Sequence, residues 1–545
     1  MKISIAQQNY IVGDFEGNYQ KIIHAIDEAV LQNADLVLFS ELTVCGYPAR
    51  DFLDYRDFTH KSLKTLNRII EYSKDKIALV IGTPTFNPKL EGKDLFNSAV
   101  FIHEGKIQFT ANKCLLPTYD IFDEYRYFES AKDFGIVEFK GYKIALTICE
   151  DIWDIDSSNP LYLMSPMEEI SKFNPDIILN LSASPYSQGH TTLRKKIVQM
   201  NALKYNAAVF YCNSVGAQTD IIFDGASIVC NSKGELVQQL PSFEESIMTF
   251  DLSDVSKSQE EINYAQEEIA LIHDALVLGI KDYFTKSGFK KAIVGLSGGV
   301  DSALVVALAA EALGAENVFS VLMPSQYSSD HSINDSLELV QNLGSQYEIV
   351  SIENAYQAFE QSLASHFEGL APNVTEENLQ SRIRGVILMA FSNKFGYILL
   401  NTSNKSEAAV GYGTLYGDMA GAIGVIGDLY KTQVYGLCQY INRNQIIIPE
   451  NILTKPPSAE LRPDQKDSDS LPDYDILDKI LFEYIENCRS PQEIIALGFE
   501  ESVVQRILSL VNRAEFKRYQ TPPLLRVSSR AFGIGRRLPI VARYL

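Results

Sequence analysis

Residues 291–302 read KAIVGLSGGVDS, and this stretch decides the fold of the second half of the chain. The apolar run KAIV is typical of a buried strand, and a helix rich in Ala, Leu and Val is predicted from Ser302. Between them, Gly298 and Gly299 allow the backbone to approach an anion closely, and the N–H groups that begin the helix favour negative charge. The hydroxyls of Ser297 and Ser302 add donors, so the pattern predicts a phosphate-binding loop between a strand and a helix.

Predicted helices and strands alternate on both sides of this loop. A helix is predicted over 262–286, and further strands are predicted within 318–324, 347–352 and 397–404, with helices between them. Such alternation gives parallel strands joined by crossover helices, and a doubly wound parallel sheet binds ligands beyond the carboxyl ends of its strands. We therefore expect the ligand-binding residues of this half to follow strands.

The first half of the chain has a different pattern of predicted elements, with many short apolar strands and fewer helices. One helix is predicted over 18–31, and strands are predicted within 2–7, 35–42, 77–84, 98–102, 143–151, 176–184, 207–214, 226–231 and 246–252. This mixture favours a layered α/β sandwich. Because segment 253–261 is polar and lacks periodicity, we expect one domain over 1–252, a linker over 253–261 and a second domain over 262–545.

Composition narrows the classes of partner. The chain has 545 residues, with 48 Lys and Arg against 69 Asp and Glu, and its net charge of −21 disfavours nucleic acid and anionic membranes. A phosphate site built locally from backbone N–H groups is compatible with that charge. The seven cysteines include no CxxC pair, which favours a reducing compartment, and no apolar stretch is long enough to span a bilayer. A cytoplasmic location is predicted.

Three reactive side chains follow predicted strands in the front half: Glu41, Lys113 and Cys149. Strand ends can converge on one cleft, where a cysteine attacks as thiolate, a carboxylate takes its proton and an ammonium stabilises the oxyanion. Together the three are sufficient for amide hydrolysis. Taken singly, each has a plainer interpretation, because a buried Cys is usually an inert apolar residue and a Glu or Lys at a strand end is usually solvated.

The segments around these residues resemble the nitrilase superfamily: FSELTVCGYP, NKCLLPTYDIFDEYRYF and TICEDIW, in the family's order. The resemblance implies an αββα sandwich over most of 1–250, with Glu41 as general base, Lys113 as oxyanion stabiliser and Cys149 as nucleophile. It also implies a further active-site carboxylate at Glu124. Within the glutaminase branch, the implied contacts to substrate glutamine are Tyr119, Ser184 and His190. The family pattern has Lys or Arg at the last of these positions, and loop packing is the alternative for the other two.

The string GLSGG also fits GxSxG, the nucleophile elbow of α/β-hydrolases. That alternative requires a downstream acid and then a His, whereas only His331 and His366 follow Ser297, and both are predicted on helices. A plain Gly-rich turn is a second alternative, but it gives Asp301 and Ser302 no role. Phosphate binding is favoured, with Asp301 as a candidate Mg²⁺ ligand beside a pyrophosphate.

The fuller string SGGVDS resembles the signature of the N-type ATP pyrophosphatases, which cleave ATP between its α and β phosphates to adenylate a substrate. Within that family, the segment 401–432 resembles the NAD synthetases, which implies ATP as co-substrate, Mg²⁺ as cofactor and deamido-NAD as acceptor. The implied ATP-binding residues are Gly295, Leu296, Ser297, Gly298, Gly299, Val300, Asp301, Ser302, Thr402 and Lys431. The implied deamido-NAD-binding residues are Asn378, Glu407, Asp418 and Lys517, and the implied metal ligands are Asp301 and Glu407.

Two more segments carry the same resemblance. Segment 377–396 is similar to the helix that crosses the dimer in this family, which implies a homo-oligomer built through synthetase-domain dimers. Its Arg382 and Arg384 either contact a ligand or are solvated helix charges. The acidic segment 460–475 is similar to the mobile loop that closes over the family's site, with an exposed turn as the alternative.

Taken together, the two halves resemble the glutamine-dependent NAD synthetases, a family of carbon–nitrogen ligases, over nearly the whole chain. We expect glutamine hydrolysis in the first half, adenylation of deamido-NAD in the second, and displacement of AMP by ammonia kept unprotonated in a shielded path. The partners are then small molecules: glutamine, ATP and deamido-NAD. An amidotransferase for another acceptor is a competing hypothesis, against which Lys517 and the segment around Glu407 argue. A non-enzymatic nucleotide sensor is another, but it would be expected to lack Cys149 or Asp301, and both are present.

Overall fold

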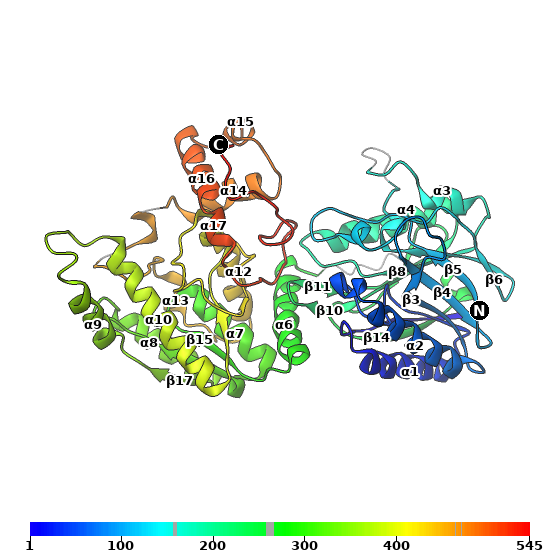
Figure 1. Cartoon of the computed structure of the whole chain (residues 1–545), viewed down its shortest axis with the longest axis horizontal. Helices are drawn as coiled ribbons and strands as arrows, with labels where there is room; N and C mark the ends of the chain where they lie inside the picture. The colour runs from blue at the N-terminus through cyan, green and yellow to red at the C-terminus, as the bar shows by residue number, and fades with distance from the viewer. Residues whose placement is uncertain (156–160, 258–265, 464, 470, 545) are drawn as a thin grey trace. The chain divides into compact units, whose positions relative to one another are not determined.

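The computed structural model of the chain describes residues 1–155, 161–257, 266–463, 465–469 and 471–544. The chain divides into two compact units, Met1–Gln266 and Glu267–Leu545 (Figure 1). The predicted linker 253–261 begins within a short helix, α5 (Leu252–Val255), and its residues 258–261 lie outside the described part of the chain.

The first unit is built on two six-stranded sheets. In spatial order, the first sheet consists of β14 (Ser246–Asp251), β1 (Lys2–Gln7), β2 (Leu36–Leu38), β3 (Ala78–Phe86), β4 (Leu95–His103) and β5 (Lys106–Asn112). The second consists of β13 (Leu236–Gln239), β12 (Ile228–Cys230), β9 (Ala208–Asn213), β8 (Ile177–Ser182), β7 (Tyr142–Ile148) and β6 (Val137–Phe139). A separate hairpin joins β10 (Val215–Gln218) to β11 (Ile221–Asp224).

Helices cover the outer faces of both sheets, so the predicted αββα sandwich is confirmed. Along β2, Leu36 and Leu38 join the core between the sheets, while Val37 joins the core beneath the outer helices, as the period of two in a strand requires. The outer helices are α1 (Phe15–Leu31), α2 (Arg56–Ser73), α3 (Pro166–Ser171) and α4 (His190–Tyr205). Short 3₁₀ helices are η1 (Arg50–Asp54), η2 (Glu124–Arg126) and η3 (Cys149–Ile152).

The second unit contains a five-stranded sheet in the order β17 (Gln346–Ile349), β16 (Val318–Leu322), β15 (Ala292–Gly295), β18 (Ile398–Asn401) and β19 (Ile423–Gly424). All neighbouring strands are parallel, which confirms the doubly wound architecture. The chain moves outward from β15 to β17 and then returns to the other side of β15. The carboxyl end of β15 is therefore the switch point at which such sheets bind ligands.

Helices follow the strands of this unit as the alternation predicted. They are α6 (Glu268–Ser287), α7 (Val300–Leu313), α8 (Asp330–Leu343), α9 (Glu353–Leu363), α10 (Val374–Phe395), α11 (Lys405–Val410), α12 (Lys431–Ile441), α13 (Glu450–Thr454), α14 (Tyr474–Ile485), α15 (Pro491–Ile495), α16 (Glu501–Arg513) and α17 (Glu515–Arg518), with 3₁₀ helices η4 (Ala315–Asn317) and η5 (Asp467–Asp469). The helix expected over 262–286 is α6, and residues 262–265 lie outside the described chain. The helix after the phosphate loop begins at Val300, two residues before the predicted start.

The structure differs from the prediction at one strand end and at several short strands. Strand β2 ends at Leu38, so Glu41 lies in the following turn, next to Leu42 with its left-handed φ of 47°. The strands β6 and β13, the hairpin β10–β11 and the two-residue strand β19 were not predicted, since each of these strands has only two to four residues. Among the described residues, no helix is both long and apolar enough to cross a membrane.

Candidate active sites

In the first unit, the structure brings together the predicted Glu41, Lys113 and Glu124. The Nζ atom of Lys113 lies 2.7 Å from Oε1 of Glu41 and 2.8 Å from Oε1 of Glu124. All three side chains are buried, at 1%, 0% and 5% exposure respectively. Lys113 directly follows β5, and Glu124 begins η2. A single ammonium group is therefore shared by two carboxylates inside the protein.

Three further groups donate hydrogen bonds to the carboxylates of this cluster, and no sequence motif predicted them. The side-chain amide of Asn97 donates to Glu41 at 2.7 Å, and the backbone N–H of Ala183 donates to the same carboxylate at 3.1 Å. The hydroxyl of Tyr47 donates to Glu124 at 2.9 Å. These donors satisfy carboxylate oxygens that burial removes from water, which is the condition for keeping charges inside a protein.

Cys149 occupies the first position of η3, directly after β7. Its φ of +45° is in the left-handed region, which is uncommon for a residue with a Cβ, and its side chain is only 6% exposed. Burial raises the pKa of the Cys149 thiol well above its usual value, the negative charge of Glu41 raises it further, and Lys113 opposes both. The resting cysteine is therefore a thiol, and the opposite charges of Glu41 and Lys113 both act on its ionisation.

Two further pKa values follow from the same burial. Burial disfavours the charged form of Lys113, but the attraction of Glu124 and Glu41 outweighs it and raises the pKa of Lys113 well above the usual value. Burial raises the pKa of Glu124 to about 7, against the attraction of Lys113. Lys113 stays protonated at neutral pH, whereas Glu124 titrates there.

The three predicted glutamine contacts lie in different settings. The hydroxyl of Tyr119 donates to Glu150, the residue after Cys149, at 2.9 Å. Ser184 is buried, and its backbone N–H donates to Asn213 Oδ1 at 2.8 Å. His190 begins α4 and stacks on Trp153 with ring centroids 5.0 Å apart.

A cation still lies near position 190, where the family pattern has Lys or Arg. Arg194, one turn further along α4, is fully buried and pairs with Asp224 at 2.9 Å. One of its Nη atoms lies 3.5 Å from Nδ1 of His190, and the same atom donates to the carbonyl of Ser184 at 3.3 Å. Arg194 therefore links two of the predicted glutamine contacts.

In the second unit, the predicted phosphate loop joins strand β15 to helix α7, which is the strand–loop–helix arrangement that its sequence predicted. Gly298 has a φ of +78°, and a Cβ there would lie 2.4 Å from the carbonyl oxygen of Ser332. The hydroxyls of Ser297 and Ser302 lie 3.1 Å apart, and Ser302 also donates to the carbonyl of Gly299 at 3.0 Å. The partners found for Ser297 in the described chain are residues of the loop itself, neither His331 nor His366, which argues against a hydrolase elbow.

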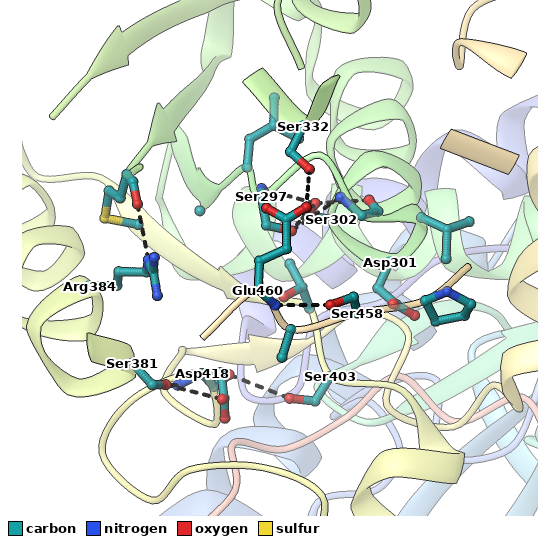
Figure 2. Close-up of a pocket in the computed structure, with 18 of the residues that line it drawn as sticks. Ser297, Asp301, Ser302, Ser332, Ser381, Arg384, Ser403, Asp418, Ser458 and Glu460 are labelled. Carbon is teal, nitrogen blue, oxygen red and sulfur yellow. Dashed lines mark hydrogen bonds between the residues drawn. The ribbon is translucent and has the colours of Figure 1, made fainter. Parts of the chain in front are cut away.

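A pocket of about 320 Å³ opens beyond the carboxyl ends of β15, β16 and β18. Figure 2 shows Ser297, Asp301 and Ser302 of the loop facing Asp418 and Ser403 across the pocket, with Arg384 and Glu460 at other parts of its wall. Its lining includes these predicted site residues: Gly295, Leu296, Ser297, Gly299, Val300, Asp301, Ser302, Thr402, Glu407, Asp418 and Lys431.

Asp301, Glu407 and Lys431 meet at one side of this pocket. The Nζ atom of Lys431 binds Oδ2 of Asp301 and lies 3.3 Å from Oε1 of Glu407. Asn404, which caps α11, donates to the other oxygen of Asp301 at 2.8 Å. Burial raises the pKa of Glu407 to about 8, and the charge of Asp301 adds to this effect. Two carboxylates thus already share one cation, which suits a divalent ion completed by phosphate oxygens.

The remaining predicted deamido-NAD contacts surround the loop that carries Asp418. Asp418 accepts the backbone N–H of Thr414 at 2.7 Å, and Asn378 accepts the hydroxyl of the same Thr414 at 2.7 Å. Lys517 donates to the carbonyls of Gly411 and Gly413, both at 2.8 Å. Asn378 and Lys517 are hydrogen bonded to this loop and are not among the described residues that line the pocket.

Comparison with known proteins identifies the family of each half of the chain. Residues 2–259 match the carbon-nitrogen hydrolase family, and residues 272–521 match the NAD synthase family. The glutamine-dependent NAD(+) synthetase of Synechocystis is 46% identical over 550 residues, covering 99% of each chain, and that of Thermotoga maritima is 39% identical, covering 100% of this chain and 99% of its own. A carbon–nitrogen hydrolase joined to a synthetase defines the class of carbon–nitrogen ligases with an amide nitrogen donor.

Solved structures agree with the same class. The glutamine-dependent NAD+ synthetase of Acinetobacter baumannii, solved with ADP, matches with a TM-score of 0.78 at 39% identity, covering 99% of this chain and 98% of that one. The enzyme from Cytophaga hutchinsonii shares the fold, with a TM-score of 0.84 at 20% identity, over 99% of this chain and 98% of its own. The chain belongs to the family of glutamine-dependent NAD(+) synthetases.

Proposed function

We propose that the chain makes NAD(+) from deamido-NAD(+), ATP and glutamine, with glutamine hydrolysed in the first unit and the amide formed in the second. Family membership supports the overall reaction. Glutamine hydrolysis is assigned to the first unit because the buried ammonium of Lys113 binds Glu41 and Glu124, and the charges of this cluster act on the Cys149 thiol. It supplies a base, a cation and a nucleophile in one place.

In the proposed hydrolysis, Glu41 takes the proton of Cys149 as the sulfur attacks the side-chain amide carbon of glutamine. The raised pKa of the thiol makes such a base necessary, because few Cys149 side chains are thiolates at neutral pH. Lys113 stabilises the oxyanion, and Glu41 passes the proton to the nitrogen, which leaves as ammonia when the C–N bond breaks. Water then cleaves the thioester to give glutamate and the free Cys149 thiol. Tyr119, Ser184 and His190 are the proposed contacts to glutamine.

In the proposed synthesis, the nicotinate carboxylate of deamido-NAD attacks the α phosphate of ATP, and pyrophosphate leaves. Ammonia then attacks the acyl carbon of the adenylate, AMP leaves, and the nitrogen loses a proton. The loop 295–302, Thr402 and Lys431 are proposed to bind ATP, because they line one pocket at the switch point of the sheet. Asn378, Glu407, Asp418 and Lys517 are proposed to bind deamido-NAD.

Asp301 and Glu407 would hold the proposed Mg²⁺. Among the described residues, no group of three or more metal-ligating side chains occurs, so substrate oxygens would complete the shell, as is usual for this ion. When bound, Mg²⁺ supplies charge neutralisation at the phosphates. Lys431 binds both carboxylates and is the proposed contact to an ATP phosphate.

A homo-oligomer and a cytoplasmic location are also proposed. Helix α10 exposes Val386, Met389 and Phe395 at 68%, 40% and 58%, which supports a second synthetase unit packing on this helix. All seven cysteines are free thiols, which supports a reducing compartment.

The test compares nitrogen sources in one assay of NAD(+) formation from deamido-NAD, ATP and Mg²⁺. Cys149→Ala should abolish synthesis with glutamine and spare synthesis with ammonium, whereas Asp301→Ala should stop both. Cys230→Ala, another buried cysteine of the first unit, is the matched control and should retain both. Loss of both activities in Cys149→Ala would contradict the division of labour, and turnover with a different acceptor would contradict the product.

A further inference from the structure

Asp151 is a buried carboxylate that none of the steps above uses. It lies in η3, two residues after Cys149, and its side chain is 4% exposed. Its Oδ1 atom accepts the backbone N–H groups of Cys114 at 3.0 Å and Leu115 at 2.9 Å. Its Oδ2 atom accepts the backbone N–H of Ile148 at 3.1 Å. The carboxylate therefore joins two distant segments of the chain through three backbone donors.

The two joined segments carry the proposed nucleophile and the proposed oxyanion stabiliser. Ile148 directly precedes Cys149, and Cys114 directly follows Lys113. The hydrogen bonds to Asp151 connect the segment of Cys149 directly to the segment of Lys113. Movement of one segment relative to the other would lengthen at least one of the three bonds. The position of sulfur relative to ammonium is thus fixed partly through Asp151.

The strained backbone at Cys149 makes such a connection necessary. A left-handed φ of +45° at a non-glycine residue persists only where the surrounding structure enforces it. Asp151 accepts a hydrogen bond from Ile148, the residue before Cys149, and lies two residues after Cys149 itself. This bond therefore spans the turn that contains the strained residue.

A carboxylate is needed for this arrangement, because donors approach both of its oxygen atoms. An amide of the same shape has one accepting oxygen and one NH₂ group, so it would place a donor against a backbone N–H on one side. Burial raises the pKa of Asp151 to about 6, with the backbone bonds and Lys113 opposing the rise. The group is therefore mostly ionised at neutral pH and accepts on both sides.

We propose that Asp151 is a positioning residue for glutamine hydrolysis, which holds the turn of Cys149 against the segment of Lys113. The inference rests on the proposed glutaminase function of the first unit. Asp151 touches no reacting atom in this scheme. Its effect is on the rate of sulfur attack rather than on glutamine binding.

Asp151→Asn tests the proposal, with Asp176→Asn as the matched control. Asp176 is exposed and accepts the backbone N–H of Lys143 at 2.8 Å, near the opposite end of the same strand β7. For both variants, kcat and KM for glutamine are measured, together with NAD(+) synthesis from ammonium. The alkylation rate of Cys149 by iodoacetamide is followed by mass spectrometry of the peptide that carries it.

We expect Asp151→Asn to lower kcat for glutamine about 10- to 100-fold with KM changed less than about threefold. Alkylation of Cys149 should slow as well, while ammonium-dependent synthesis and the Asp176→Asn control stay at wild-type rates. Wild-type values of both kcat and alkylation in Asp151→Asn would overturn the inference. Failure of this inference is distinguishable from failure of the proposed function. A wild-type chain without Cys149-dependent glutamine hydrolysis would refute the proposed function. The alkylation rates of Cys149 would still test the positioning role of Asp151.

Discussion

The ammonium of Lys113 and the carboxylate of Glu41 form an ion pair 2.7 Å long, with 0% and 1% of the two side chains exposed. Charges removed from water at this depth are costly unless each is paired and hydrogen bonded. Glu124, Asn97 and Ala183 complete the set of partners. The pair is therefore both the proposed chemical centre and a point of structural vulnerability.

Lys113→Met should abolish glutamine-dependent synthesis and destabilise the first unit by about 3–5 kcal/mol, because two buried carboxylates lose their shared cation. Urea unfolding followed by hydrogen exchange in the first unit measures the stability, and ammonium-dependent synthesis reports on the second unit. Lys106→Met, at an exposed position of the same strand β5, is the control and should change neither quantity. An unchanged unfolding midpoint for Lys113→Met would contradict the buried ion pair.

Glutamine hydrolysis should decline as the pH is lowered through about 7. Burial raises the pKa of Glu124 to about 7, so the carboxylate that shares Lys113 gains a proton and loses its charge below that pH. The hydrogen bond from Tyr47 lowers the pKa of Glu124, so Tyr47→Phe should move this acid limb toward higher pH. The measurement is kcat/KM for glutamine between about pH 5.5 and about pH 8.5.

Tyr127→Phe is the control for this pH profile. Its hydroxyl donates to an exposed carboxylate, that of Asp51, so its removal should leave the acid limb in place. A limb that does not move in Tyr47→Phe, or one that moves equally in both variants, would rule out Glu124 as its origin.

The sequence predicted the groups with a proposed chemical role better than the groups that hydrogen bond to them. Glu41, Lys113 and Cys149 stand in motifs that can be recognised along the chain. Asn97 and Tyr47, in contrast, reach their carboxylates across 56 and 77 residues of sequence, and no local pattern indicates such contacts. Both become visible only after the two sheets have packed.

In the second site, one local sequence pattern includes a residue that contacts the predicted metal ligand Asp301. Asn404 caps the start of helix α11 and Glu407 is its third residue, which is a capping-box pattern, and the same Asn404 donates to Asp301. The pattern predicts the start of α11, but the contact to Asp301 depends on β18 lying beside β15. Sheet order is a long-range property, so alternating helices and strands predicted its parallel class but not which strands are neighbours.

The two glycines of the phosphate loop should differ sharply in their tolerance of a methyl group. Gly298 has a φ of +78°, and an added Cβ would lie 2.4 Å from the backbone oxygen of Ser332. This contact is too short, and relieving it requires a shift of the backbone. Gly299 has an ordinary φ of −85°, and its Cβ would meet the hydroxyl of Ser297 at 3.3 Å. Gly298→Ala should therefore displace the loop and raise KM for ATP about tenfold or more, and Gly299→Ala should change it less.

ATP titration of ammonium-dependent synthesis measures this difference, and thermal unfolding shows whether either variant loses its fold. Equal KM values for ATP in the two variants would show that the left-handed position does not shape the phosphate site.

One carboxylate also links the two helices that carry Glu407 and Lys431. Asp478, in α14 and 4% exposed, accepts the hydroxyl of Ser406 at 2.5 Å and the backbone N–H of Thr432 at 2.9 Å. The same Ser406 hydroxyl accepts the backbone N–H of Lys431 at 2.9 Å. These bonds attach to the residue just before Glu407 and to the residues at the start of α12.

Asp478→Asn should therefore slow synthesis with glutamine and with ammonium alike, about 10-fold or more, because its NH₂ group cannot accept the bond that Ser406 or Thr432 donates, which loosens the register of α11 against α12. Glutamine hydrolysis assayed alone should be unchanged, since the change lies in the second unit. Asp475→Asn, an exposed position one turn earlier in α14, is the matched control. Full ammonium-dependent activity in Asp478→Asn would mean that Glu407 and Lys431 keep their relative positions without this bridge.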